Sequence, residues 1–190
     1  MDSTPALDVE RTVPAPDRSS DLGRKAALYV GTVGLVVALD VLTKAKVEST
    51  LRLYDPVPVW GDFFRLTYIF NRGAAFGLHL GDSSRFIFLG LAVLAVVVLF
   101  FMYRSTPWTD RLRLFAIASV TGGAIGNLVD RVRSDRGVVD FLDFGFGTTR
   151  WPVFNVADIA VTVGAVLLAV SLWKEEQRNE REEKGGAATA

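Results

Sequence analysis

Almost every charged residue of this chain lies between or beyond four long apolar segments. A helix of about 20 residues, rising 1.5 Å per residue, spans the roughly 30 Å hydrocarbon core of a bilayer. Sequences such as FIFLGLAVLAVVVLFFMY lack the polar face that a helix of a soluble bundle presents to water. In the third segment, Gly122 and Gly126 form a small-xxx-small face for close helix contact. The pattern predicts four transmembrane helices, over residues 26–43, 86–103, 112–130 and 153–173.

The polar segments between the spans are predicted to lie on two sides of the membrane. Four crossings place the tails 1–25 and 174–190 on one side and the loops 44–85 and 131–152 on the other. The first tail, rich in Pro, Asp, Ser and Arg, is expected to be disordered, and the second to be a charged helical extension. Lys and Arg are divided almost evenly between the sides, but the short arginine-rich connection beside the tails favours cytoplasmic tails.

The first outer loop carries a strand pattern. Between residues 63 and 71, FFRLTYIFN alternates apolar and more polar positions with a period of two. Pro56, Pro58 and Gly61 break the chain before it, and 45–53 is expected to form a short amphipathic helix at the interface. The predicted fold class is a mainly α membrane protein, with a small β-rich extracytoplasmic cradle in the first outer loop.

Composition narrows the possible chemistry. The 190-residue chain has a formal net charge of zero, no cysteine and one histidine, His79. A net charge of zero does not suggest a basic surface, so nucleic acid is not expected as a partner. Without cysteine the chain cannot form a disulfide, and its single imidazole cannot build a His-rich zinc site. His79 adjoins a Gly-Asp-Ser turn and is interpreted as a surface residue, and we expect no metal and no cofactor.

Polar side chains are costly inside a bilayer, so those near the span ends are the candidates for function. Asp40 and Lys44 lie one turn apart at the outer end of the first span, and either pair locally or organise a site. Near the outer end of the third span, Asn127 and Arg131 share a helical face. Asp130 is adjacent and is expected to support Arg131.

The fourth span carries acid and amide groups at helical spacing. Asn155, Asp158 and Thr162 fall on one predicted helical stripe, and Asp140 and Asp143 precede them in an apolar run. Two carboxylates in a low-dielectric site share one proton, so one can act as acid and the other as base to activate a water molecule. Proton-coupled transporters also bury acids, so a small transporter is the alternative. The polar groups crowd toward the outer side, which disfavours a transport path.

Five sequence blocks make the interpretation more specific: DVLTK at 40–44, FNRGAAFG at 70–77, GGAIGNLVDR at 122–131, GVVDF at 137–141 and FNVAD at 154–158. Their order and spacing closely resemble the lipoprotein signal peptidases, the type II signal peptidases of bacteria. The resemblance covers approximately residues 26–173. It implies an aspartic endopeptidase of the bacterial inner membrane with both termini cytoplasmic and its active site near the outer leaflet. Such an enzyme cleaves prolipoproteins just before their diacylglyceryl-modified cysteine.

The resemblance also implies roles for individual residues. By motif, the catalytic pair is Asp140 and Asp158, and Asp143 and Asp130 lie outside that pair. The substrate-binding and supporting positions match Asp40, Lys44, Asn71, Asn127, Asp130, Arg131 and Asn155. Lipid-modified prolipoproteins and membrane lipids are the implied partners, without nucleic acid, and the family further implies a monomer that globomycin-type cyclic peptides inhibit. The main departure is the charged segment 132–139, which is slightly longer than in some relatives.

Overall fold

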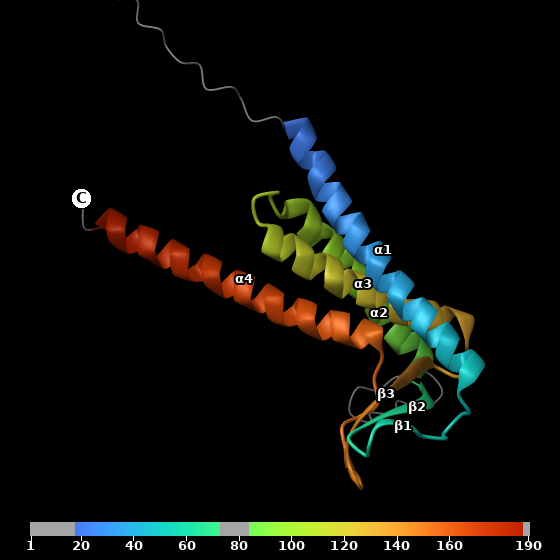
Figure 1. Cartoon of the computed structure of the whole chain (residues 1–190). Helices are drawn as coiled ribbons and strands as arrows, with labels where there is room; N and C mark the ends of the chain where they lie inside the picture. The colour runs from blue at the N-terminus through green and yellow to red at the C-terminus, as the bar shows by residue number, and fades with distance from the viewer. Residues whose placement is uncertain (1–17, 73–83, 188–190) are drawn as a thin grey trace, which may run out of the picture.

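The computed structural model of this chain describes residues 18–72 and 84–187. Within these two ranges it forms four long helices and one small antiparallel sheet (Figure 1). The helices are α1 (Arg18–Thr50), α2 (Ser84–Ser105), α3 (Arg111–Arg133) and α4 (Val156–Ala187). Each contains a segment that is long and apolar enough to cross a membrane. The predicted class, a mainly α membrane protein with four transmembrane helices and a small sheet, is confirmed.

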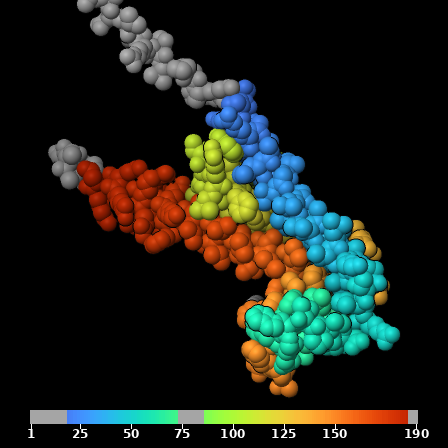
Figure 2. All heavy atoms as spheres, in the orientation of Figure 1, coloured from blue at the N-terminus to red at the C-terminus, as the bar shows by residue number. Residues whose placement is uncertain are grey.

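The outer faces of the helices carry large apolar side chains. Val30 of α1, Leu94 of α2 and Val166 of α4 are each more than half exposed. Such exposure is unfavourable in water, whereas lipid acyl chains cover it in a bilayer. α1 and α4 converge near the sheet and diverge toward their other ends, as Figures 1 and 2 show. The wide end of this arrangement carries the start of α1 and the end of α4.

The sheet lies beyond one end of the helices and is built from the segment between α1 and α2 and the segment between α3 and α4 (Figure 1). Its described strands are β1 (Val57–Trp60), β2 (Phe64–Asn71), β3 (Val138–Phe146) and β4 (Thr149–Arg150), in the order β1-β2-β3-β4. The strand pattern at 63–71 is confirmed as β2. β3, from the second loop, was not predicted, because VVDFLDFGF lacks a simple period of two. The β2–β3 register sets Asn71 opposite Val138 and Ile69 opposite Asp140.

α1 extends beyond the predicted span at both ends. It begins at Arg18, so residues 18–25 are helical, in contrast to the expected disorder of the tail. It also continues unbroken to Thr50, and the prediction of a separate interfacial helix over 45–53 is wrong. The continuation is stabilised because Val47 is buried in the same hydrophobic cluster as the inner side chains of β2 and β3.

α3 is the central helix and packs against the other three. Its glycines permit this close approach, as the small-xxx-small pattern predicts. A Cβ atom added to Gly122 would lie 2.8 Å from the Cβ of Val36 on α1, and Gly123 faces the start of α4 in the same way. At Gly126 the added atom would lie 2.6 Å from a carboxylate oxygen of Asp40. Gly126 therefore provides the space that a buried charged side chain of α1 occupies.

Several sequence features lie outside the described residues. They are the turn containing His79, and the part of the FNRGAAFG block that follows Arg72, including Gly73 and Gly77. The interpretation of His79 as a surface residue therefore stays a prediction.

We expect Gly126→Ala to lower the free energy of unfolding by about 1–3 kcal/mol, because the new methyl group would displace Asp40 from its buried ion pair. The measurement is thermal unfolding of the purified protein in detergent. Gly31→Ala on α1 is the matched control, since a Cβ there would meet nothing within 4 Å. A Gly126→Ala protein as stable as the control would contradict this account of α1–α3 packing.

Candidate active site

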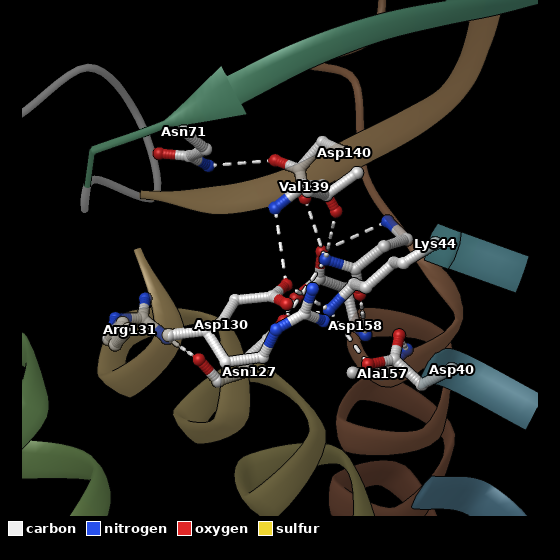
Figure 3. A network of polar contacts seen from close by, with 12 residues as sticks. Asp40, Lys44, Asn71, Asn127, Asp130, Arg131, Val139, Asp140, Ala157 and Asp158 are labelled. Carbon is white, nitrogen blue, oxygen red and sulfur yellow. Dashed lines mark hydrogen bonds and ion pairs between the residues drawn. The ribbon is translucent and has the colours of Figure 1, made fainter. Parts of the chain in front are cut away.

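Most of the polar residues singled out in the sequence meet where the ends of α1, α3 and α4 reach the sheet (Figure 3). They come from helices and strands far apart along the chain. All belong to one connected set of hydrogen bonds and ion pairs: Asp40, Lys44, Asn71, Asn127, Asp130, Arg131, Asp140, Asn155 and Asp158. This set is called the polar network below.

The N-terminus of α4 lies inside the polar network. Asn155 precedes the helix, and its side-chain oxygen accepts a hydrogen bond from the Asp158 amide at 2.9 Å. In return, the Asp158 carboxylate accepts one from the Asn155 amide at 3.1 Å. This reciprocal pair is a capping box. The helix therefore begins after Asn155, and the prediction that Asn155 lies on a helical stripe with Asp158 is wrong.

A residue of another helix completes this cap. Asp40 of α1 is fully buried, and one of its oxygens accepts a hydrogen bond from the Ala157 amide at 2.9 Å. The first turn of a helix has backbone N–H groups without intrahelical acceptors, and it favours negative charge. Asp40 thus joins α1 to α4 by a charge-assisted hydrogen bond.

The carboxylates of Asp140 and Asp158 are held by three asparagine side chains. The Asn155 amide group donates to Asp140 at 2.6 Å, and Asn127 donates to Asp158 at 2.8 Å. Asn71, at the end of β2, donates to the second oxygen of Asp140 at 2.9 Å (Figure 3). Both oxygens of each carboxylate therefore accept a hydrogen bond, and Asn155 contacts both acids.

The environment of Asp140 favours its protonated form. Burial, followed by the negative charge of Asp158, raises the pKa of Asp140 to about 7, although hydrogen bonds from Asn71 and Asn155 oppose the shift. Asp140 is 1% exposed, so bulk water screens this effect little. A pair of carboxyl groups that holds one proton near neutral pH can supply both an acid and a base.

Lys44 compensates the negative charges of Asp40 and Asp130, which lie close to the pair Asp140 and Asp158. It is 2% exposed, and its ammonium group contacts Asp40 at 2.7 Å, Asp130 at 2.8 Å and the Asn127 side-chain oxygen at 3.1 Å. Its three N–H donors therefore match three acceptors. The expected local pair of Asp40 and Lys44 is present and is part of the wider network. Because the side-chain oxygen of Asn127 accepts from Lys44, the NH₂ group of the same amide faces Asp158.

Asp130 has contacts beyond its expected support of Arg131. Its carboxylate accepts a hydrogen bond from the Val139 amide at 3.2 Å and pairs with Lys44, so it ties α3 to β3 and α1. Its negative charge also favours the cationic form of the neighbouring Arg131. The Arg131 guanidinium further donates to the Asn127 carbonyl at 3.0 Å.

Asp143 lies outside the polar network, although it is only three residues from Asp140. An odd separation along a strand turns the two side chains to opposite faces. Asp143 is buried against Thr67, at 2.6 Å, and Arg150. Burial opposes ionisation, but these hydrogen bonds and the charges of Arg150 and Arg65 outweigh it and hold the pKa of Asp143 below its ordinary value. Asp143 fastens β2, β3 and β4 together.

A cleft of about 370 Å³ opens beside the acid pair. Its polar wall includes Arg131 and the two carboxylates, and its apolar wall includes Trp151 and Phe154. These two aromatic residues also line a second, more apolar groove of about 290 Å³ that continues from Asp158 along α4. Sequence reasoning missed both aromatics. The available signal was an aromatic Trp-Pro pair directly before the fourth span.

Sequence comparison connects this arrangement to known proteins. The signal peptidase II family model matches residues 32–174. The lipoprotein signal peptidase of Desulforapulum autotrophicum is 46% identical over 136 residues, which cover 70% of this chain and 83% of the relative. That of Syntrophotalea carbinolica is 43% identical over 147 residues, covering 77% and 91%.

Structural comparison agrees with the sequence match. A solved structure described as a bacterial membrane enzyme is 29% identical, has a TM-score of 0.70, and is matched over 83% of this chain and 92% of its own. The family match selects a peptidase over the proton-coupled transporter. With its four membrane-spanning helices and its cap of sheet, this chain belongs to the signal peptidase II family of membrane proteases, the lipoprotein signal peptidases.

Proposed function

We propose that this protein removes signal peptides from diacylglyceryl-modified prolipoproteins by cutting just before the lipidated cysteine, with Asp140 and Asp158 as its catalytic pair. The supporting observation is that Asn155 donates to Asp140 and caps α4 together with Asp158, so that one side chain links both acids at the cleft. The substrate assignment rests on the family, whose curated relatives carry the name lipoprotein signal peptidase.

In the proposed reaction, Asp140 begins with the proton and Asp158 begins as the carboxylate. Asp158 accepts a proton from water as the water oxygen attacks the peptide carbonyl carbon, while Asp140 donates its proton to the carbonyl oxygen. The tetrahedral intermediate collapses when its C–N bond breaks. Asp158 then gives its proton to the leaving amine, and Asp140 recovers one from the hydroxyl group that becomes the new carboxyl product.

Both the peptide part and the lipid part of the substrate would contribute to its recognition. The polar wall of the cleft, with Asn71, Asn127 and Arg131, suits a peptide backbone, and the apolar groove along α4 suits acyl chains. Each buried CH₂ group contributes about 0.8 kcal/mol to membrane partitioning, so lipid contacts can supply much of the binding energy. A substrate anchored in the same bilayer would reach the cleft by lateral diffusion.

The same proposal includes the setting of the enzyme. It is a monomer in the bacterial inner membrane, with both termini cytoplasmic and the polar network near the outer leaflet. Globomycin-type cyclic peptides would occupy the cleft as inhibitors. The charged connection between α2 and α3 agrees with a cytoplasmic location of that end, because Arg104 and Arg111 lie there.

Substitution of either acid should remove catalysis. We expect Asp140→Asn and Asp158→Asn each to lower the cleavage rate of a lipid-modified prolipoprotein about 10²- to 10⁴-fold, because each loses an acid–base group. The measurement is product formation by purified protein in detergent or nanodiscs. Asp62→Asn, at a half-exposed position, is the control. Full activity in either variant would rule out this pair, and loss in Asp143→Asn alone, with folding intact, would indicate the wrong partner acid.

The rate should also fall as pH rises through about 7. Asp140 has a raised pKa, so it is protonated below this pH and loses its donor proton above it. The measurement is kcat/KM as a function of pH on a peptide substrate carrying the lipid. Asp143→Asn should keep the same midpoint, because Asp143 lies on the opposite face of β3. A rate that is flat or increases through this range contradicts Asp140 as the proton donor.

The two roles of Asn155 can be separated. Serine is a good helix N-cap but lacks the amide N–H groups that contact Asp140 and Asn127. We therefore expect Asn155→Ser to keep the thermal stability close to wild type while lowering the cleavage rate at least tenfold, about the effect of losing one charge-assisted hydrogen bond. Asn155→Ala should lose both stability and activity. Equal activity of the serine variant and the wild type would restrict Asn155 to helix capping.

A further inference from the structure

A second cleft, of about 530 Å³, lies where the apolar part of α4 ends, about four to six helical turns from the acid pair. It is formed where the beginning of α3 and the connection before it face α4, toward the wide end of the helix arrangement (Figure 1). Its lining includes Pro107, Asp110, Arg113, Ser171, Lys174 and Arg178. None of these residues belongs to the polar network, so the proposed peptidase chemistry leaves this cleft without a role.

The walls of this cleft are held in place by Arg113. Its guanidinium contacts Asp110 at 3.1 Å and Glu175 at 2.7 Å, and donates to the Ser171 hydroxyl at 3.3 Å. Arg113 is 14% exposed and Ser171 is buried, so these contacts are partly shielded from water. These contacts fix α4 against α3 beside the cleft. Both acidic side chains of the lining, Asp110 and Glu175, are thereby paired with Arg113.

Two further cations give the lining its excess charge. Lys174 pairs with none of the described residues, and Arg178 contacts only Glu182 among them, at 3.9 Å between two largely exposed side chains. Such an exposed contact contributes little and is easily exchanged. Three cationic and two acidic side chains line the cleft, which leaves one net positive charge. Lys174 and Arg178 are therefore available to an anionic group.

Aromatic residues place this cleft at the membrane surface. The apolar part of α4 ends at Trp173, which is 58% exposed and directly precedes Lys174. On the facing side, the Arg111 guanidinium lies 4.6 Å from the ring of Trp108. Tryptophan beside Lys or Arg is typical of the level at which lipid headgroups meet the hydrocarbon core.

We propose that this cleft binds the phosphodiester headgroup of a glycerophospholipid, with a preference for anionic lipid, through Lys174 and Arg178. Arg113 holds the walls in place, and Leu112 and Pro107 provide apolar contacts for the glycerol and upper acyl chain. This lipid is distinct from the substrate, because it lies at the other end of the apolar part of α4. The proposal goes beyond the peptidase function and does not depend on the identity of the catalytic acids.

Native mass spectrometry of the purified full-length protein tests this proposal with dioleoyl phosphatidylglycerol as the probe. Dioleoylglycerol, which has the same acyl chains without phosphate, and glycerol 3-phosphate, which has the phosphate without acyl chains, are run in parallel. Of the three compounds, we expect only phosphatidylglycerol to bind tightly. Replacing both cations in Lys174→Gln/Arg178→Gln should weaken that binding about 30-fold, the effect expected for two basic residues near an anionic headgroup.

The matched control is Arg181→Gln/Lys184→Gln, which removes the same charge from α4 outside the cleft. It should bind phosphatidylglycerol as the wild type does, and both double variants should retain peptidase activity, which reports on correct folding. Equal weakening in the two double variants, or none in the cleft variant, would overturn the proposal. Binding of glycerol 3-phosphate as tight as that of the phospholipid would identify a soluble phosphate as the ligand instead.

Discussion

The N-terminus of α4 is buried between two helices and a sheet, and its backbone N–H groups need acceptors that water cannot easily supply. Asn155, Asp158 and Asp40 provide them, each from a different position relative to the helix. Because Asn155 also donates to Asp140, the groups that satisfy the helix end are the groups that hold the two acids together. Capping the helix and assembling the candidate site are therefore one structural requirement.

Burying this many acids has an electrostatic cost that the fold compensates locally. Lys44 and Arg131 are the two cations of the polar network, and Lys44 contacts Asp40, Asp130 and Asn127 at once. Breaking a buried pair leaves an uncompensated charge, which is far more unfavourable than never having formed it. Gly126 contributes by leaving room for the Asp40 carboxylate. The polar network thus depends on close contact between α1 and α3, and that contact requires a glycine at position 126.

α4 connects two membrane surfaces with different chemistry. Its first turn carries Asp158 beside a cleft and an apolar groove, as suits a substrate that is half peptide and half lipid. The apolar part of α4 ends at Trp173, next to Lys174 of a cleft with excess positive charge. A helix that is anchored at both headgroup levels has a defined depth in the bilayer, and depth determines where a membrane-anchored substrate meets the acids.

The number of spans, the strand at 63–71 and the candidate polar residues could be predicted from the amino-acid pattern, because bilayer thickness and burial leave local patterns that need no knowledge of the fold. The family resemblance added the choice of Asp140. Long-range contacts explain why Asp140 and not Asp143 lies with Asp158, because the pairing of β2 with β3 sets which side of the strand each acid occupies. That register, and the role of Asn155 as a cap, arise from contacts between distant segments, which no local pattern records.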